Sequence, residues 1–260
     1  MSSSCRPLSV NHLLAALSPS DFERLLPHME WVTLRAGATL HQAGEPLRHV
    51  YFPATAVISL LASMRDGAAT QVAAVGNEGV AGVCAFMGGR EALCSGVVLS
   101  AGSAWRVGIH AVVELARSCE KLMQAVMGYM QLLFTQIAQI SACNRHHAIE
   151  QQLCRWLLIN LDGLAGTEVR ATQERIALLL GVRREGVTTG AGRLQSAGLI
   201  RYGRGRISVI DRKGLEQRSC ECYSVIRQAK QRLLEKMPGG TSAAIVPLAH
   251  KSARNVELAA

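Results

Sequence analysis

The sequence predicts an α+β protein with an N-terminal antiparallel β-roll, a long helix and a C-terminal winged helix-turn-helix. Three observations support this prediction. Short alternating apolar segments separated by glycine fill residues 29–108, which is typical of antiparallel strands. After Ile109 the apolar residues recur at helical spacing. The last third of the chain is basic and contains two short helical patterns joined at Gly181, followed by a hairpin pattern.

The chain has 260 residues, of which 49% are hydrophobic, so it is long enough for two domains and a connector. We expect a β-roll with N-terminal helices at 1–113, a long helix at 114–146 and a winged helix-turn-helix with a C-terminal helix at 147–236. Residues 237–260 show little periodicity, and we expect them to be disordered.

Composition excludes several classes of protein. Aromatic residues make up only 4% of the chain, which disfavours a platform that stacks single-stranded bases. No apolar run approaches the about 20 residues that a membrane span requires. Residues 1–20 lack the basic start and apolar core of a secretory signal, so we expect a cytoplasmic protein without a membrane partner.

The eight cysteines are expected to be free thiols, because the cytoplasm is reducing. Cys220 and Cys222 would point poorly at one metal ion if their segment were helical. Cys143 with His146 or His147 is better spaced, but zinc sites usually contain two such pairs. The sequence therefore predicts no metal site.

The N-terminal region begins with short helices at 9–28 and continues with at least six strands. Gly37, Gly67, Gly76 and other glycines mark the turns between the strands. The expected strands are 31–34, 50–52, 57–61, 71–75, 97–99 and 105–107.

The long helix carries two apolar stripes. The first follows the 4-3-4-3 spacing of a coiled-coil seam, and the second, Met123 to Ile137, runs beside it. We expect one side to cover the β-roll and the other to pair two copies of the chain, although burial of the whole helix within one subunit is an alternative. The predicted dimerisation residues are Leu122, Val126, Tyr129, Leu133, Ile137 and Ile140.

All of the net positive charge lies in the last part of the chain. Residues 1–150 contain 10 Lys and Arg against 10 Asp and Glu, whereas residues 151–260 contain 18 against 9. A helix at 149–161 leads into this region, and a last helix is expected at about 215–236. A basic module of this kind is suited to lie against the phosphates of duplex DNA.

The helix-turn-helix is predicted from its caps and its apolar spacing. Thr172 caps the first helix, Gly181 forms the turn, and the second helix runs from about Arg183 to Ala197. Burial of Val187 and its helical neighbours turns the polar residues of this second helix outward. The hairpin that follows has its tip at 203–206, where two arginines could contact backbone phosphates. The expected DNA-binding residues are Thr172, Gln173, Arg183, Arg184, Glu185, Thr188, Thr189, Arg193, Arg204 and Arg206.

These motifs together resemble the Crp/Fnr family of bacterial transcription regulators, over roughly residues 10–215. The likeness is strongest in Thr172-Gln-Glu, in Gly181-Val-x-Arg-Glu-x-Val187 and in Arg193-Leu-x-x-x-Gly-Leu-Ile200. It implies a cyclic-nucleotide-binding-like roll, a homodimer on an inverted-repeat operator, and base contacts from Arg184 and Glu185. RNA polymerase would be a partner if the protein is an activator. The family commonly has arginine where Thr189 stands, so one base contact that the resemblance implies is missing.

The sensor half departs from the cyclic-AMP-binding members of this family. Ala81 falls near the position of the glutamate, and Cys94 falls at the position of the phosphate-binding arginine. Without a carboxylate and a guanidinium there, cyclic AMP loses its two main anchors. Cys5 stands alone at the N-terminus, so an iron–sulfur site is not expected, while haem stays open. The candidate effector positions are Ala81, Gly82, Arg90, Cys94 and Ser95, and the effector is unknown.

Two other functions are compatible with the sequence. The roll could be a cupin-like metal-dependent enzyme, although His41 and His49 lack a third ligand. The winged module could instead contact protein while the roll binds a ligand. A regulator without catalytic residues is the leading prediction.

Overall fold

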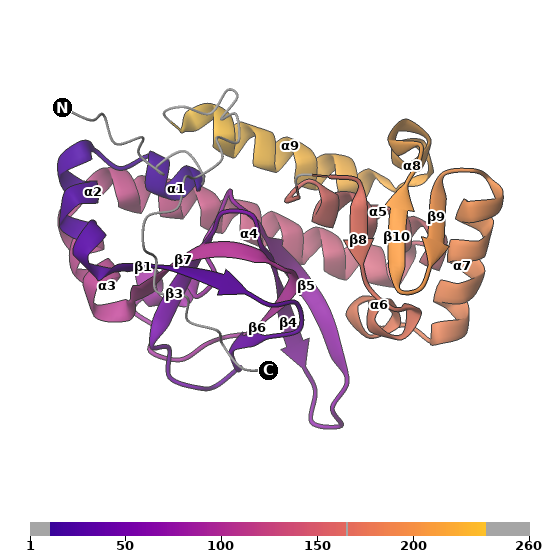
Figure 1. Cartoon of the computed structure of the whole chain (residues 1–260), viewed down its shortest axis with the longest axis horizontal. Coiled ribbons are helices and arrows are strands. Elements are labelled where there is room, and N and C mark those ends of the chain that lie inside the picture. Colours follow the sequence, from indigo (N-terminus) through magenta and orange to yellow (C-terminus); the bar gives the residue numbers. More distant parts are fainter. Residues whose placement is uncertain (1–10, 165, 238–260) are drawn as a thin grey trace.

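The computed structural model describes residues 11–164 and 166–237, and Figure 1 shows its arrangement. Two short helices, α1 (His12–Ala15) and α2 (Pro19–Leu25), and the 3-10 turn η2 (Leu26–His28) precede the strands. Asn11 caps α1 by accepting from the backbone N–H of Leu13 and Leu14, and Ser18 caps α2. The expected short helices in this region are therefore confirmed.

The β-roll consists of two antiparallel sheets. One sheet has the order β1-β7-β3 and the other has the order β2-β6-β4-β5. All six predicted strands are present, and β2 is an additional one. The strands are β1 (Met29–Leu34), β2 (Thr39–His41), β3 (His49–Pro53), β4 (Val57–Ser63), β5 (Ala69–Val75), β6 (Ser95–Ser100) and β7 (Gly102–Gly108).

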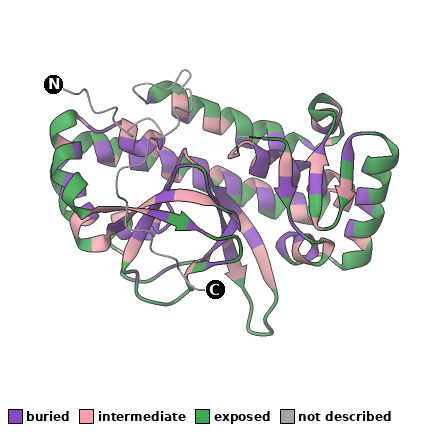
Figure 2. Cartoon of the chain, in the orientation of Figure 1, coloured by how far each residue is buried: buried purple, intermediate pink, exposed green. Residues whose placement is uncertain are grey.

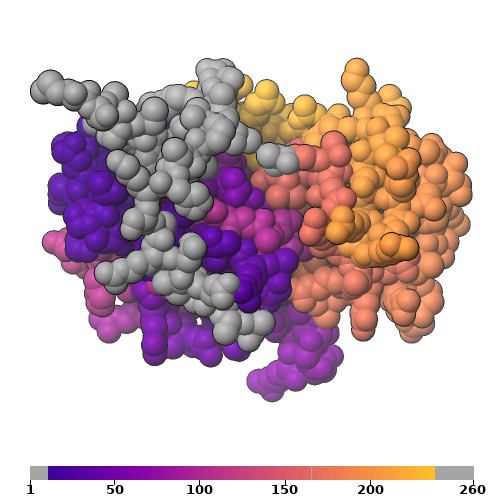
Figure 3. All heavy atoms as spheres, in the orientation of Figure 1, coloured from indigo at the N-terminus to yellow at the C-terminus, as the bar shows by residue number. Residues whose placement is uncertain are grey.

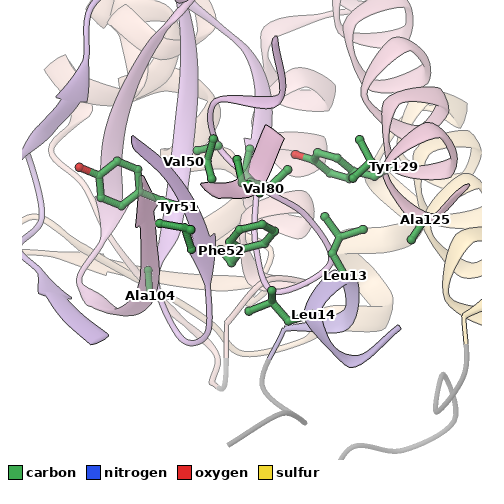
Figure 4. Close-up of a cluster of buried hydrophobic side chains, with 14 of the residues drawn as sticks. Leu13, Leu14, Val50, Tyr51, Phe52, Val80, Ala104, Ala125 and Tyr129 are labelled. Atoms are coloured by element: carbon green, nitrogen blue, oxygen red, sulfur yellow. The ribbon is translucent and has the colours of Figure 1, made fainter. Parts of the chain in front are cut away.

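The core of the roll lies between these sheets and the helices that cover them (Figure 4). Phe52 of β3 and Leu13 of α1 are fully buried there, as is Tyr129 from the long helix. Gly79 lies directly beneath the Tyr129 ring, and a Cβ atom at this glycine would be only 2.1 Å from the ring. This close approach lets the long helix pack on the roll.

The long helix, α4 (Glu120–His146), begins later than predicted because residues 109–118 form a separate helix, α3 (Ile109–Ser118). Cys119 between them has an extended backbone conformation (φ −113°, ψ 93°), which ends the first helix and starts the second. No helix in the described ranges is both long and apolar enough to cross a membrane.

The predicted dimer seam on α4 is covered by the rest of the same chain. Leu122, Val126 and Tyr129 are fully buried, and Leu133 and Ile140 are each 6% exposed. The buried face packs against the roll and against α9, so these five residues do not form a free surface. The exposed large apolar side chains of α4 belong to the second stripe: Met127 is 63% exposed, Phe134 65% and Ile137 40%.

The C-terminal segment forms two helices where one was expected, α8 (Arg212–Arg218) and α9 (Glu221–Lys236). Ser219 and Cys220 between them are extended (ψ 158° and 167°). Helix α9 lies alongside α4 (Figure 1), and the partly exposed Lys230 of α9 forms an ion pair with the buried Glu78 of the roll. The predicted disordered tail lies outside the described residues, apart from Met237.

The winged helix-turn-helix occupies the end of the molecule opposite helices α1 and α2 (Figure 3). The second hydrophobic core of the chain lies in this domain. It includes Trp156, Ile176 and Leu194 and also contacts β4 and β6 of the roll. The strand order of its small sheet is β8-β10-β9. Its elements are α5 (Ile149–Leu161), β8 (Glu168–Arg170), α6 (Gln173–Leu180), α7 (Arg184–Ser196), β9 (Ile200–Gly203) and β10 (Arg206–Val209).

Candidate nucleic-acid interface

Helix α6 is built and ended as its sequence predicts. The Thr172 hydroxyl accepts a hydrogen bond from the Arg175 N–H at 3.1 Å and so caps the helix. Ile176 is fully buried and anchors α6 in the core. Gly181 ends the helix in the left-handed conformation (φ 67°), which reverses the chain direction toward α7.

Helix α7 buries one face and exposes the other, as Figure 2 shows. Val187, Ala191 and Leu194 are buried, while the candidate contact residues on the opposite face are exposed. A Cβ atom at Gly186 would be 2.5 Å from Ile149 Cδ1, so this glycine allows α7 to pack closely on α5. The exposed candidate contact residues are Arg184, Glu185, Thr188, Thr189, Gly192 and Arg193.

Two residues of the predicted set hold the helices together. The Thr188 hydroxyl donates to Gln173 Oε1 at 2.7 Å and also lies 3.1 Å from the Arg184 carbonyl oxygen. This link connects the start of α6 to α7 and fixes the orientation of the exposed face. Arg193 Nη1 lies 3.9 Å from Glu150 Oε2, so the carboxylate partly neutralises the charge of Arg193.

The wing is a tight hairpin. Arg204 (φ 50°) and Gly205 (φ 73°) form its two-residue turn, and both have the positive φ values of a type I′ turn. Arg204 and Arg206 are exposed at the tip, and Glu168 of β8 lies 3.9 Å from Arg206. The predicted wing arginines are therefore on the surface, and Arg204 forms no ion pair within the described residues.

Bonds from the wing to its neighbours hold it beside α7. The Tyr202 N–H donates to Gln195 Oε1 of α7 at 2.8 Å, and the Tyr202 hydroxyl donates to the Ala171 carbonyl at 3.4 Å. Strand β8, which the sequence analysis missed, pairs with β10 and supports the hairpin from the other side. Its three residues are too few to produce a recognisable alternation.

The candidate effector positions do not share one environment. Ala81 is fully buried and exchanges backbone hydrogen bonds with Tyr51 at 2.8 and 3.0 Å, and Gly82 follows it in the left-handed conformation. Arg90 is exposed, whereas Cys94 is partly buried. Burial raises the pKa of the Cys94 thiol, which makes it a weaker nucleophile at neutral pH. The Ser95 hydroxyl accepts from the Ala43 N–H at 3.1 Å.

The two histidines considered for a cupin-like site lie in different sheets. His41 on β2 covers Gly96, and a Cβ atom there would be 2.5 Å from the ring. His49 on β3 faces Tyr51, with ring centroids 6.5 Å apart. In the part of the chain that the structure describes, neither histidine belongs to a group of three or more possible metal ligands.

Comparisons with known proteins agree with this architecture. Residues 151–218 match the family model of the Crp-like helix-turn-helix domain. A Crp/Fnr-family regulator from Eubacterium rectale superposes with a TM-score of 0.63 at 15% identity, covering 79% of this chain and 96% of that one. FixK2 from Bradyrhizobium japonicum gives 0.61 at 16% identity, covering 74% of this chain and 98% of that one.

A third solved structure, the c-di-GMP-responsive regulator CLP from Xanthomonas campestris, gives a TM-score of 0.60 at 14% identity, covering 74% of this chain and 99% of that one. A search of curated protein sequences found no match. Residues 151–218 therefore form a Crp-like helix-turn-helix domain, and the chain has the fold of the Crp/Fnr-family regulator from Eubacterium rectale.

Proposed function

We propose that this chain is a homodimeric transcription regulator that recognises an inverted repeat in duplex DNA through α7. The observation that supports this most is the surface made by α7 and the wing. Arg184, Glu185 and Thr189 are exposed on α7, and Arg204 is exposed on the hairpin beside it. This surface belongs to the basic part of the chain, so its charge attracts the phosphates of DNA. Its exposed helix has a shape that fits a DNA groove.

The two ends of this surface suit different parts of DNA. Arg184 and Glu185 lie in the first turn of α7, where recognition helices contact base edges. An arginine there can pair with guanine, and a glutamate can accept from the cytosine amino group. Arg204 at the wing tip suits the flanking phosphates, which position the protein without reading sequence.

The dimer interface is proposed at the exposed stripe of α4. Met127, Phe134 and Ile137 are separated by seven and three residues, so they lie in one row on the helix. Three large apolar side chains exposed in a row favour a partner surface. Pairing of two α4 helices would relate two α7 helices by a two-fold axis, with half-sites about 34–36 Å apart.

A charge placed in this stripe tests the dimer. Phe134→Glu should shift the chain from dimer to monomer in sedimentation at micromolar concentration, because it buries a carboxylate between the helices. Lys121→Glu is the control, since this residue is exposed on another side of α4 and should leave the dimer intact. A dimer that survives Phe134→Glu would exclude this interface.

The effector is proposed to differ from cyclic AMP. Ala81 is buried in backbone pairing, and Cys94 offers a thiol where a guanidinium is needed, so neither supplies a charge to a cyclic nucleotide. Calorimetry should therefore detect no micromolar binding of cyclic AMP.

Selection of bound duplexes from a random pool tests the proposal as a whole. We expect enrichment of an inverted repeat, and affinity that falls steeply with salt because phosphate contacts release counterions. A pool without enrichment would contradict the proposal, and a single, unrepeated motif would contradict its dimeric form. A winged module that contacts protein would give no enrichment at any salt concentration.

A further inference from the structure

Two pairs of possible metal ligands, far apart in sequence, meet where the long helix joins the winged domain. Cys143 lies in the last turn of α4, and His147 closes that helix. Cys220 directly precedes α9, and Cys222 is the second residue of α9. We call this group the Cys–His cluster. One ligand atom from each of the four residues lies within 4.8 Å of all the others.

The spacing of these atoms suits one tetrahedral ion. The Cys143 and Cys220 sulfur atoms are 3.4 Å apart, and Cys222 Sγ is 3.6 Å from His147 Nδ1. A tetrahedral zinc with bonds of about 2.3 Å to sulfur and about 2.0 Å to nitrogen places its ligand atoms roughly 3.6–3.8 Å apart. We propose that the Cys–His cluster binds one zinc ion in a closed site of three thiolates and one imidazole.

The expectation of no metal site rested on a helical segment at Cys220 and Cys222 and on the lack of a second ligand pair. Cys220 instead has an extended backbone (φ −80°, ψ 167°) ahead of α9, so its thiol and that of Cys222 can face the same point. In the sequence each of the two pairs seemed to lack a second pair, and the fold brings Cys143 and His147 next to Cys220 and Cys222.

The surroundings of His147 match those of a metal ligand. Its Nε2 lies 3.3 Å from Glu221 Oε1, which leaves Nδ1 directed toward Cys222. Metal-binding histidines usually donate their second ring N–H to a carboxylate or carbonyl oxygen, which fixes the ring and its tautomer. The backbone is also held, because the His147 N–H donates to the Cys143 carbonyl at 3.0 Å.

A buried arginine supplies the charge that such a site needs. Arg155 is only 2% exposed, and its Nε and Nη1 atoms have no hydrogen-bond partner among the described residues. Burial lowers the pKa of this guanidinium, and the three cysteines of the cluster act in the opposite direction. Zinc with three thiolates and a neutral imidazole has a net charge of −1, which Arg155 would balance. If the cluster held only neutral thiols, it would supply no negative charge to balance the Arg155 guanidinium.

Two other readings account for less of the geometry. A disulfide between Cys143 and Cys220 would use two of the four groups and leave the His147–Glu221 pair and Arg155 unexplained. A polynuclear iron–sulfur cluster would spread its ligands around several irons, whereas these four atoms converge on one point. Three thiolates and one imidazole are a ligand set typical of structural zinc.

The position of the site suggests its role in the fold. Residues 147 and 148 connect α4 to α5, and residues 219 and 220 connect α8 to α9. A zinc ion shared by these two junctions would fix the angle between the long helix and the winged domain. The ligation itself is independent of whether the chain binds DNA.

Metal analysis of the full chain tests the site. Protein purified without a metal-affinity tag, under reducing conditions, should contain one zinc per chain. Cobalt(II) exchanged into it should show thiolate charge-transfer absorption and tetrahedral ligand-field bands. Cys220→Ser and His147→Ala should lose most of the zinc. The matched controls are Cys154→Ala, a buried thiol outside the cluster, and His146→Ala, the exposed neighbouring histidine, and both should keep it.

Glu221→Gln separates zinc binding from folding. Glu221 has a side chain that is 73% exposed, so its loss should not unfold the chain, but zinc affinity should fall about 10–100-fold because the ring loses its carboxylate. Zinc absent from the wild type even after reconstitution would overturn the proposal. So would a native Cys143–Cys220 disulfide, iron in place of zinc, or full zinc content in both Cys220→Ser and His147→Ala.

Discussion

We predict that replacing Lys230 lowers the free energy of unfolding strongly, although this residue is partly exposed. Its Nζ lies 2.8 Å from Glu78 Oε2, and it also donates to the Asp162 carbonyl at 3.0 Å. The lysine therefore ties α9 to the β-roll and to the end of α5. The Glu78 side chain is only 4% exposed, and its other oxygen accepts from the Gly76 N–H at 2.8 Å.

Lys230→Met leaves the Glu78 carboxylate buried with one backbone hydrogen bond and no counterion. Breaking a buried pair from one side typically costs about 3–5 kcal/mol. Glu78→Gln should cost less, about 1–3 kcal/mol, because it removes the buried charge and leaves Lys230 its bond to Asp162. The double variant should be more stable than Lys230→Met alone, since it no longer buries an unpaired charge.

The effect should also depend on pH. Burial by itself would raise the pKa of Glu78, but the ion pair with Lys230 and the Gly76 N–H hold that pKa below its ordinary value. The stabilisation is then complete above the unfolded pKa of about 4.3 and is lost as pH falls through the lower, folded pKa. In Lys230→Met burial is opposed only by backbone hydrogen bonds, so the pKa of Glu78 should be higher than in the wild type.

Urea unfolding of the four proteins of this cycle, at about pH 7 and about pH 4, measures both effects. The deficit of Lys230→Met should shrink in acid, where its carboxylate is neutral. The reasoning is refuted if that variant loses less than about 1 kcal/mol at neutral pH, well below the range for a broken buried pair. A deficit that does not change with pH would refute the assignment to the Glu78 charge.

Three further outcomes are expected. Gly192→Ala should stabilise the chain by about 0.5–1 kcal/mol in thermal unfolding, because Gly192 is helical and nothing lies within 4 Å of an added Cβ. Gly186→Ala should stabilise it less than Gly192→Ala, since the added Cβ would be 2.5 Å from Ile149 Cδ1 and the Ile149 side chain would have to move. Equal effects of the two changes would contradict the packing of α7 on α5. Calorimetry with cyclic AMP should give no micromolar binding, and a clear isotherm would show that the buried Ala81 region still admits a nucleotide.

Sequence patterns predicted much of the fold because the strands, helix caps and turns are each determined by a few neighbouring residues. Alternating strands between glycine turns, the Thr172 cap and the left-handed Gly181 each depend on a few neighbouring residues. The six expected strands and both helices of the helix-turn-helix follow from such signals. The exposed face of α7 was predictable for the same reason, since three buried residues fix the rotation of a short helix.

Features that depend on distant parts of the chain were not predictable in this way. Both stripes of α4 have coiled-coil spacing, and only the packing of the roll and α9 decides that Tyr129 is buried while Phe134 is exposed. Cys143 and Cys220 are separated by 77 positions, and their proximity depends on the break before α9. Periodicity within one segment carries no information about either outcome.

The most direct test of the DNA-reading surface compares Arg184→Ala with Arg204→Ala. Fluorescence anisotropy would measure both variants on the selected duplex and on a scrambled one, at several salt concentrations. Arg184→Ala should lose about 1–3 kcal/mol on the selected duplex and little on the scrambled one, because it removes a base contact. Arg204→Ala should weaken both duplexes similarly and lower the salt slope by about one unit. Equal loss on both duplexes for Arg184→Ala would contradict recognition by α7.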